Sequence, residues 1–214
     1  MPAKFYYFDV YGKGECIRMA LTKAGVAFED LQMAGDAWKE LKETGKPTFG
    51  QLPLLELEDG TCLLQTTAIC NYLGAVYKLA PEDPLAQYKG QVICEHMWND
   101  FFGKYVPSTL FMPPGAERDE KLKVLMTEFQ KFCVNLAKLL PEDKKFISGD
   151  TTTVYDFQVA GFFTNLVLNE FAKDKDVWAV EWEKAPARVK QYVADFQEDQ
   201  KDYLAARPKG TRTV

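Results

Sequence analysis

Residues 51–69, QLPLLELEDGTCLLQTTAI, hold the groups whose types and spacing best suit chemistry. A proline leads into a predicted strand, an Asp-Gly pair follows, and a second strand ends at Gln65 and Thr66. An Asp-Gly pair between two apolar runs favours a two-residue hairpin with positive φ at both turn positions. The backbone at Leu52 and the amide and hydroxyl donors of Gln65 and Thr66 then form a surface suited to a small peptide-like anion.

The composition disfavours several other kinds of site. The net charge of −5 argues against a nucleic-acid partner, because phosphate binding needs clustered basic residues. The five cysteines form no C-x-x-C pair, which predicts reduced, mostly buried thiols in a cytoplasmic protein. His96 is the only histidine, so a zinc site, a Ser-His-Asp triad and a Cys-His pair are all poorly supported. No apolar run is long enough to span a bilayer, and no membrane partner is expected.

The first third of the chain alternates strand and helix patterns. Strands are expected over 4–10, 27–31, 54–58 and 61–64, helices over 15–24 and 69–76, and a loop or short helix over 34–50. The order β-α-β followed by β-β-α predicts a small mixed sheet with covering helices.

The rest of the chain is predicted to be helical. Pro81 and Pro84 mark a linker, placed at 80–84. Beyond it, helical patterns run through 92–105, 122–139, 153–169 and 187–204, with interruptions expected near Pro107, Pro113 and Pro114. Residues 153–169 are apolar on nearly every side, which predicts a central buried helix that begins with a capping box between Thr153 and Asp156. The fold class is therefore α/β plus all-α.

Five segments, taken together, resemble the cytosolic glutathione transferases. They are FYYFDVYGKGE, Trp38 followed four residues later by Lys42, FGQLPLLELEDG, QTTAICNYL and TTTVYDF. Each is weak alone, but their order and spacing are specific, and the resemblance covers essentially the whole chain. It implies a thioredoxin-like glutathione-binding domain at 1–79 and an all-helical domain at 85–214 that contributes the acceptor pocket. The chain is most similar to the tyrosine-type sigma and mu classes.

The resemblance implies a catalytic tyrosine, which matches Tyr7. In the family, a tyrosine of the first strand donates a hydrogen bond to the sulfur of glutathione. A thiol with a pKa of about 8.5 is only slightly ionised at neutral pH, and a hydroxyl donor favours the reactive thiolate. Tyr6 is the adjacent candidate, but strand alternation sends the two side chains to opposite faces. A packed core aromatic is the alternative role for either.

The resemblance also implies the positions that hold the tripeptide. These are Lys13, Trp38, Lys42, Gln51, Leu52, Pro53, Gln65 and Thr66, together with Asp100 from the partner subunit. Pro53 is expected in the cis form, and Leu52 is expected to pair with the cysteinyl unit. Gln65 and Thr66 would bind the γ-glutamyl carboxylate, and Trp38 and Lys42, with Gln51 assisting, the glycine carboxylate. The alternatives are helix capping by Thr66, a solvated charge at Lys42 or Asp100, a loop anchor at Trp38 and an ordinary strand-start proline.

The acceptor pocket is expected between the domains, lined by Tyr11, Lys13, Tyr105 and Phe111. Lys13 departs from the sigma pattern, which often carries an arginine there, so its role in tuning the sulfur stays open. No metal is expected, because His96 and Asn99 stand where some sigma members have acidic residues.

The resemblance implies a cytoplasmic homodimer that conjugates glutathione, its co-substrate, to small apolar electrophiles in detoxification. Two alternatives remain: a glutathione-dependent isomerase or peroxidase of the sigma type, and a non-catalytic ligand carrier or structural relative.

Overall fold

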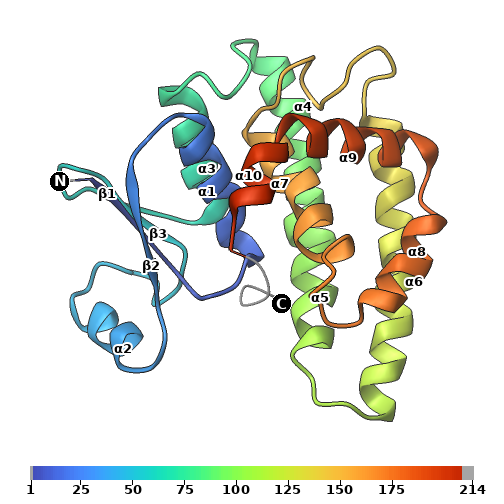
Figure 1. Cartoon of the computed structure of the whole chain (residues 1–214), viewed down its shortest axis with the longest axis horizontal. Coiled ribbons are helices and arrows are strands. Elements are labelled where there is room, and N and C mark those ends of the chain that lie inside the picture. The colour runs from blue at the N-terminus through green and yellow to red at the C-terminus, as the bar shows by residue number, and fades with distance from the viewer. Residues whose placement is uncertain (1, 209–214) are drawn as a thin grey trace.

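The N-terminal part of the protein is a mixed sheet with helices on both faces, and the C-terminal part is helical (Figure 1). The structure is a computed structural model and describes residues 2–208. The strands are β1 (Ala3–Tyr7), β2 (Phe28–Gln32), β3 (Leu54–Glu56) and β4 (Cys62–Leu64), in the order β2-β1-β3-β4. β1 pairs parallel with β2 and antiparallel with β3, and β3 pairs antiparallel with β4. The predicted mixed sheet is confirmed.

The helices of this part are α1 (Glu15–Lys23), α2 (Gly35–Glu43) and α3 (Thr66–Val76), with the short turn η1 (Gly12–Gly14) before α1. α1 and α3 pack together, and the buried face of α1 joins Phe5 and Tyr7 in the main core. The opposite face of the sheet carries a small cluster in which Tyr6 meets Leu41 of α2. The segment 34–50, for which either a loop or a short helix was expected, therefore contains a helix.

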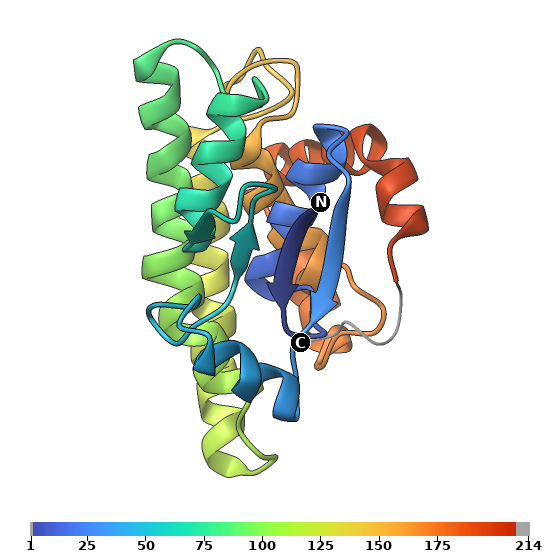
Figure 2. The same ribbon diagram turned by 90° about the vertical axis from the view of Figure 1, so that its left-hand side faces the viewer.

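Two long helical rods lie side by side in the C-terminal part (Figures 1 and 2). One runs through α4 (Pro84–Glu95), the π-helical turn η2 (His96–Phe102) and α5 (Gly103–Leu110), and the other is α6 (Ala116–Leu139). The remaining helices are α7 (Val154–Phe162), η3 (Phe163–Val167), α8 (Lys175–Glu183), α9 (Ala187–Asp199) and α10 (Lys201–Ala206). Every residue of α7 is buried, and α7 contacts α1, α3 and α4, so it is the central helix that the sequence predicts.

The turn between β3 and β4 differs from the predicted two-residue hairpin. Leu57 N–H donates to the Thr61 carbonyl at 2.8 Å, which leaves a three-residue loop closed by Gly60 at φ 88°. Asp59 has no positive φ, and its carboxylate accepts the Thr61 N–H at 2.8 Å. The prediction was wrong because the aspartate side chain stabilises a turn in which only the glycine needs the left-handed region.

The helical segment before Phe111 also differs from the prediction. Pro107 lies inside α5 and does not interrupt it, since α4, η2 and α5 follow one another without a break. The π-helical turn lies within this rod, just before the proline. α8 was not predicted, and a one-residue break at Gln200 divides the expected helix over 187–204 into α9 and α10.

The capping box at the start of α7 is confirmed. The Asp156 carboxylate accepts the Thr153 N–H and hydroxyl, each at 2.8 Å. It also accepts the Ile147 N–H and the Tyr192 hydroxyl, each at 3.0 Å. One buried carboxylate therefore fixes the N-terminus of the helix against a neighbouring loop and α9.

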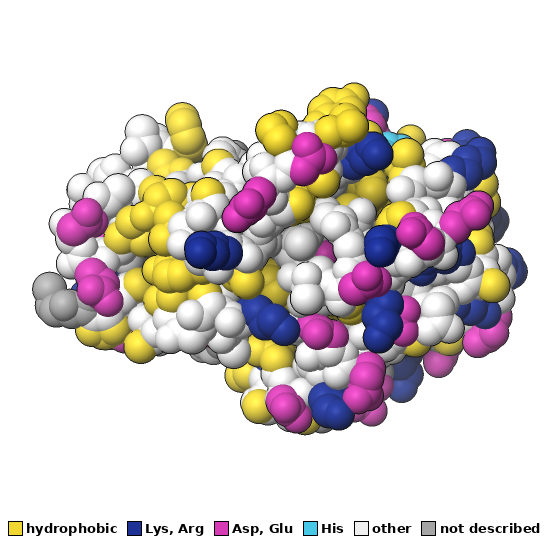
Figure 3. All heavy atoms as spheres, turned by 90° about the horizontal axis from the view of Figure 1, so that it is seen from above, with side chains coloured by type: hydrophobic (Ala, Val, Ile, Leu, Met, Phe, Trp, Pro, Cys, Tyr) yellow, Lys and Arg dark blue, Asp and Glu magenta, His cyan; other side chains and the backbone are white. Residues whose placement is uncertain are grey.

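Charges of both signs are interspersed over the helical half of the molecule (Figure 3). None of the helices within residues 2–208 is both long enough and apolar enough to cross a membrane.

Candidate active site

Tyr7 ends β1 with its side chain against the core face of the sheet, and its residue surface is 7% exposed. The Lys13 backbone N–H donates to the Tyr7 hydroxyl oxygen at 3.0 Å. Because that oxygen accepts from the backbone, its own proton can be donated to a ligand. Tyr6 points to the other face, where its hydroxyl donates to Glu56 at 2.8 Å. Of the two candidates, the structure places only Tyr7 beside the loop at 12–14.

Burial raises the pKa of Tyr7 to about 12, although the hydrogen bond from the Lys13 N–H acts in the opposite direction. The phenol therefore keeps its proton throughout the neutral and mildly alkaline range. A hydrogen-bond donor that stays protonated is what a thiolate partner requires, because the bond then favours the anion over the thiol.

Gly14 determines how closely the loop approaches the Tyr7 ring. A Cβ at this position would lie 2.5 Å from Cδ1 and 2.7 Å from Cγ of that ring. The loop therefore packs directly against the ring, and only glycine leaves room for both.

The segment predicted to bind the peptide backbone lies beside the start of α3. The Leu52–Pro53 bond is cis, as the family resemblance implies. Gln51, Leu52, Pro53 and Gln65 line a shared shallow hollow together with Leu64 and Phe49. Within residues 2–208, neither the N–H nor the C=O of Leu52 has a backbone hydrogen bond. An extended peptide could therefore pair with this residue as a short strand.

Gln65 and Thr66 stand at the N-terminus of α3, where the first backbone N–H groups have no partner within the helix. Gln65 is exposed and has φ 70°, an uncommon conformation for a non-glycine residue that is associated with binding sites. The helix dipole favours an anion here. Their role in binding a carboxylate stays a prediction.

Trp38 and Lys42 lie one turn apart on α2, and the Lys42 Nζ is 5.2 Å from the centroid of the Trp38 ring. Phe8 meets Trp38 edge-on at 6.0 Å, which places this pair beside the end of β1. The exposed ammonium at the edge of the sheet suits a terminal carboxylate.

Lys13 turns its side chain toward the helical domain. Its Nζ lies 5.3 Å from the Trp98 ring centroid and 5.8 Å from the Phe102 ring centroid, both in η2. Burial lowers the pKa of this half-buried lysine. Its carbonyl accepts the Cys16 thiol at 3.3 Å, so the peptide that supports Tyr7 is anchored to α1 as well.

The other predicted acceptor residues occupy different surroundings. Tyr11 is 2% exposed, its hydroxyl donates to the Pro208 carbonyl, and the Arg207 guanidinium lies 4.2 Å from its ring centroid. Tyr105 is half-buried, and Phe111 is 71% exposed at the end of α5. The structure therefore places Tyr11 beneath the C-terminal segment and Phe111 at the surface.

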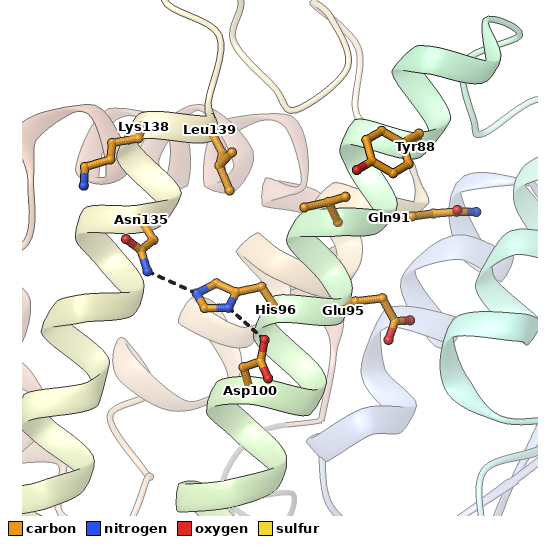
Figure 4. A pocket seen from close by; sticks show the side chains of 9 residues that line it. Tyr88, Gln91, Glu95, His96, Asp100, Asn135, Lys138 and Leu139 are labelled. Carbon is orange, nitrogen blue, oxygen red and sulfur yellow. Dashed lines mark hydrogen bonds and ion pairs between the residues drawn. The ribbon is translucent and has the colours of Figure 1, made fainter.

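Asp100 lies on the outer face of η2, in a surface cavity of about 630 Å³ between this rod and α6 (Figure 4). His96 Nδ1 is 3.3 Å from one of its carboxylate oxygens, and the Lys104 Nζ donates to the other at 3.1 Å. Both interactions lower the pKa of Asp100, with Lys104 as the larger cause. The carboxylate is exposed.

The sequence patterns did not identify Gly14, Trp98 or Phe102, nor Gln158, whose side-chain oxygen accepts the Trp98 Nε1–H at 2.9 Å. Trp98 and Phe102 are four residues apart, so helical periodicity places them on one face. Gln158 offers no comparable signal, because it lies in an apolar helix where a polar side chain has no predictable partner. Within the described residues, no group of three or more His, Cys, Asp or Glu side chains is arranged to hold a metal ion.

Several known proteins are similar to this chain in sequence and in fold. Residues 3–75 match the family model for the glutathione S-transferase N-terminal domain. Glutathione S-transferase 1 of Ascaris suum is 31% identical over 96% of this chain and 97% of its own. The crystal structure of the glutathione S-transferase from Ascaris lumbricoides is similar at a TM-score of 0.77 and 27% identity, covering 98% of both chains. A monomeric glutathione S-transferase from the hookworm Necator americanus shares the fold, at a TM-score of 0.80 and 22% identity over 98% of both chains.

The chain therefore belongs to the glutathione S-transferase family. Its fold is the thioredoxin-like domain followed by a helical domain, and its activity is that of a glutathione transferase. The family inferred from the five sequence segments is confirmed.

Proposed function

We propose that the Tyr7 hydroxyl donates a hydrogen bond to the sulfur of bound glutathione and so stabilises the thiolate nucleophile, while the proton of the thiol leaves to solvent. The observation that carries this proposal is the 3.0 Å hydrogen bond from the Lys13 N–H to the Tyr7 oxygen. It orients the hydroxyl and leaves its proton available to the sulfur. The thiolate then attacks an electrophilic carbon and forms a carbon–sulfur bond. Either a leaving group departs with its bonding pair, or the π electrons of an activated double bond shift to the activating group, which then takes a proton from solvent.

The tripeptide would lie along the edge of the sheet between α2 and α3. The backbone of Leu52 would pair with the cysteinyl unit, and the N-terminus of α3 would bind the γ-glutamyl carboxylate. Lys42 and Trp38 would hold the glycine carboxylate at the other end. The 5.2 Å contact between the Lys42 Nζ and the Trp38 ring, and the hollow shared by Leu52 and Gln65, support this layout.

The acceptor would bind on the helical-domain side of Tyr7, beside the half-buried Tyr105 and the Lys13 side chain. Lys13 is the cation on that side, and it would stabilise negative charge as the electrophile reacts. A pocket lined by aromatic side chains suits apolar electrophiles. A tyrosine-type enzyme of the sigma or mu kind fits this arrangement, and its setting would be cytoplasmic detoxification.

Parallel assays distinguish conjugation from its rivals. Purified protein with glutathione would be given an aryl halide, an α,β-unsaturated carbonyl, an organic peroxide and an endoperoxide. We expect turnover of at least one of the first two. Turnover of only the peroxide or the endoperoxide would replace conjugation with the peroxidase or isomerase alternative. Glutathione binding without turnover of any of the four would favour a carrier.

We further propose a homodimer through the outer face of α4 and α6. Leu85, Tyr88 and Val92 of α4 and Leu139 of α6 are exposed apolar side chains. Tyr88, Val92 and Leu139 line the cavity that contains Asp100, so a second copy docked here would cover this carboxylate and bring it toward the partner's glutathione.

A charge introduced into this face tests the dimer. We expect Tyr88→Lys to convert a dimer to a monomer in sedimentation velocity, because an ammonium would be desolvated in the interface. Val180→Lys, at an equally exposed valine of α8, is the matched control and should leave the dimer intact. A wild-type protein that sediments as a monomer, the state described for the hookworm relative, would contradict the proposal.

A further inference from the structure

The Lys13 ammonium rests in a corner formed by two aromatic rings. The Trp98 and Phe102 rings meet edge-to-face, with centroids 5.0 Å apart and planes at 77°. The Lys13 Nζ lies within cation–π distance of both rings, at 5.3 and 5.8 Å. A flexible four-carbon side chain is thereby held at one place between the domains.

Gln158 holds the Trp98 ring in its orientation through a hydrogen bond to the indole. The Trp98 Nε1–H donates to the Gln158 Oε1 at 2.9 Å. The Gln158 amide donates to the Val154 carbonyl at 3.0 Å, which determines which end of the side chain faces the indole. Gln158 is 1% exposed in α7, so neither its position nor its hydrogen bonds depend on solvent.

The same Gln158 oxygen also contacts α3, the helix predicted to bind glutathione. The Thr67 hydroxyl donates to the Gln158 Oε1 at 3.4 Å, and Thr67 is the second residue of α3, next to Thr66. One buried amide thus connects the helix predicted to bind the γ-glutamyl carboxylate with the ring that supports the acceptor-side cation. These contacts join α3, η2 and α7 around the loop that carries Lys13.

We propose that Gln158 and Trp98 are positioning residues, which hold the Lys13 ammonium where negative charge develops on the acceptor. This inference rests on the proposed function, in which Lys13 faces the acceptor. Neither residue touches the reacting atoms. Loss of either would leave Lys13 charged but free to swing into water, so the rate of conjugation would fall while glutathione still bound.

A double-mutant cycle tests whether Gln158 acts through Lys13. We expect Gln158→Leu to lower kcat/KM for the acceptor about threefold to tenfold, as expected for losing a partly buried cation–π contact, with little change in KM for glutathione. Lys13→Met should cause a loss at least as large. In the Lys13→Met background, Gln158→Leu should have no further effect. Equal losses in both backgrounds would overturn the proposal, because they would show a role in general packing.

Variants of Trp98 separate the indole hydrogen bond from the ring face. Trp98→Phe keeps an aromatic face but loses the N–H that donates to Gln158, so it should lose about as much as Gln158→Leu, whereas Trp98→Leu, which also loses the ring, should lose more. Similar losses in both Trp98 variants would contradict the role of the ring face. Gln130→Leu is the matched control, since Gln130 makes its hydrogen bonds to Glu181 far from the site.

Failure of this inference is distinguishable from failure of the proposed function. If Lys13→Met leaves kcat/KM unchanged while Tyr7→Phe abolishes most activity, the positioning role is wrong and the role of Tyr7 stands. If Tyr7→Phe is as active as the wild type, the proposed function itself is wrong.

Discussion

Replacing Tyr7 with Phe is expected to lower the rate of conjugation at neutral pH by about 10- to 100-fold. A hydrogen bond to a charged group contributes about 1.5–3 kcal/mol, which corresponds to one to two units of thiol pKa. Without it, bound glutathione would be mostly thiol at neutral pH. Its affinity should change little, because the carboxylate-binding positions are untouched. The rate should recover as pH rises, since the thiol then ionises without help.

Steady-state rates over a range of pH and a direct glutathione titration measure these effects. Tyr6→Phe is the matched control. It removes a hydroxyl from the neighbouring residue of the same strand, on the opposite face of the sheet, where that hydroxyl donates to Glu56. Conjugation in that variant should keep the wild-type pH profile. A Tyr7→Phe enzyme with an unshifted profile would remove Tyr7 from the mechanism.

Replacing Gly14 with Ala is expected to have the second largest effect. The added Cβ would lie 2.5 Å from Cδ1 of the Tyr7 ring, so the ring or the loop must move. A displacement of about 1 Å at a reacting group can cost about 100-fold in rate, and overpacking costs about 1–3 kcal/mol of stability. We expect conjugation to fall by about 10- to 100-fold, with a lower midpoint of urea unfolding.

Gly161→Ala is the control for the added methyl group. Gly161 lies in α7, where a Cβ would meet its nearest atom, the Met19 Sδ, at an ordinary 3.7 Å. Alanine in a helix should be neutral or stabilise by up to about 1 kcal/mol, with activity retained. If Gly14→Ala is as active as this control, the packing of the loop against Tyr7 is unimportant for catalysis.

Local sequence patterns predict much of the fold. The aromatic residues near the start of the chain form β1, and the apolar stripe that follows them forms the buried face of α1. α7 is apolar on nearly every side because it is buried on every side. The patterns fail where contacts beyond the local sequence determine the structure. Pro107 lies inside a helix that it was expected to interrupt, and the Asp59 side chain stabilises a three-residue turn by accepting the Thr61 N–H.

Local sequence patterns predict less of the site than of the fold. The motif places Tyr7, and strand alternation separates it from Tyr6, so geometry and sequence agree there. The direction of Lys13 depends on Trp98 and Phe102, which are distant in the chain and meet it only after the domains pack. Tyr11 looks like a wall residue in sequence, but Arg207, nearly two hundred residues later, covers its ring. Such long-range contacts leave no local signal.

Ultraviolet titration of glutathione bound to the wild-type protein tests most directly whether Tyr7 creates a thiolate. Absorbance of the bound thiolate, followed against pH with free glutathione as reference, gives the pKa of the sulfur in the site. A bound pKa one to two units below that of the free tripeptide is expected, since the protonated Tyr7 phenol would favour the anion. A bound thiol that ionises at the same pH as free glutathione would contradict the account.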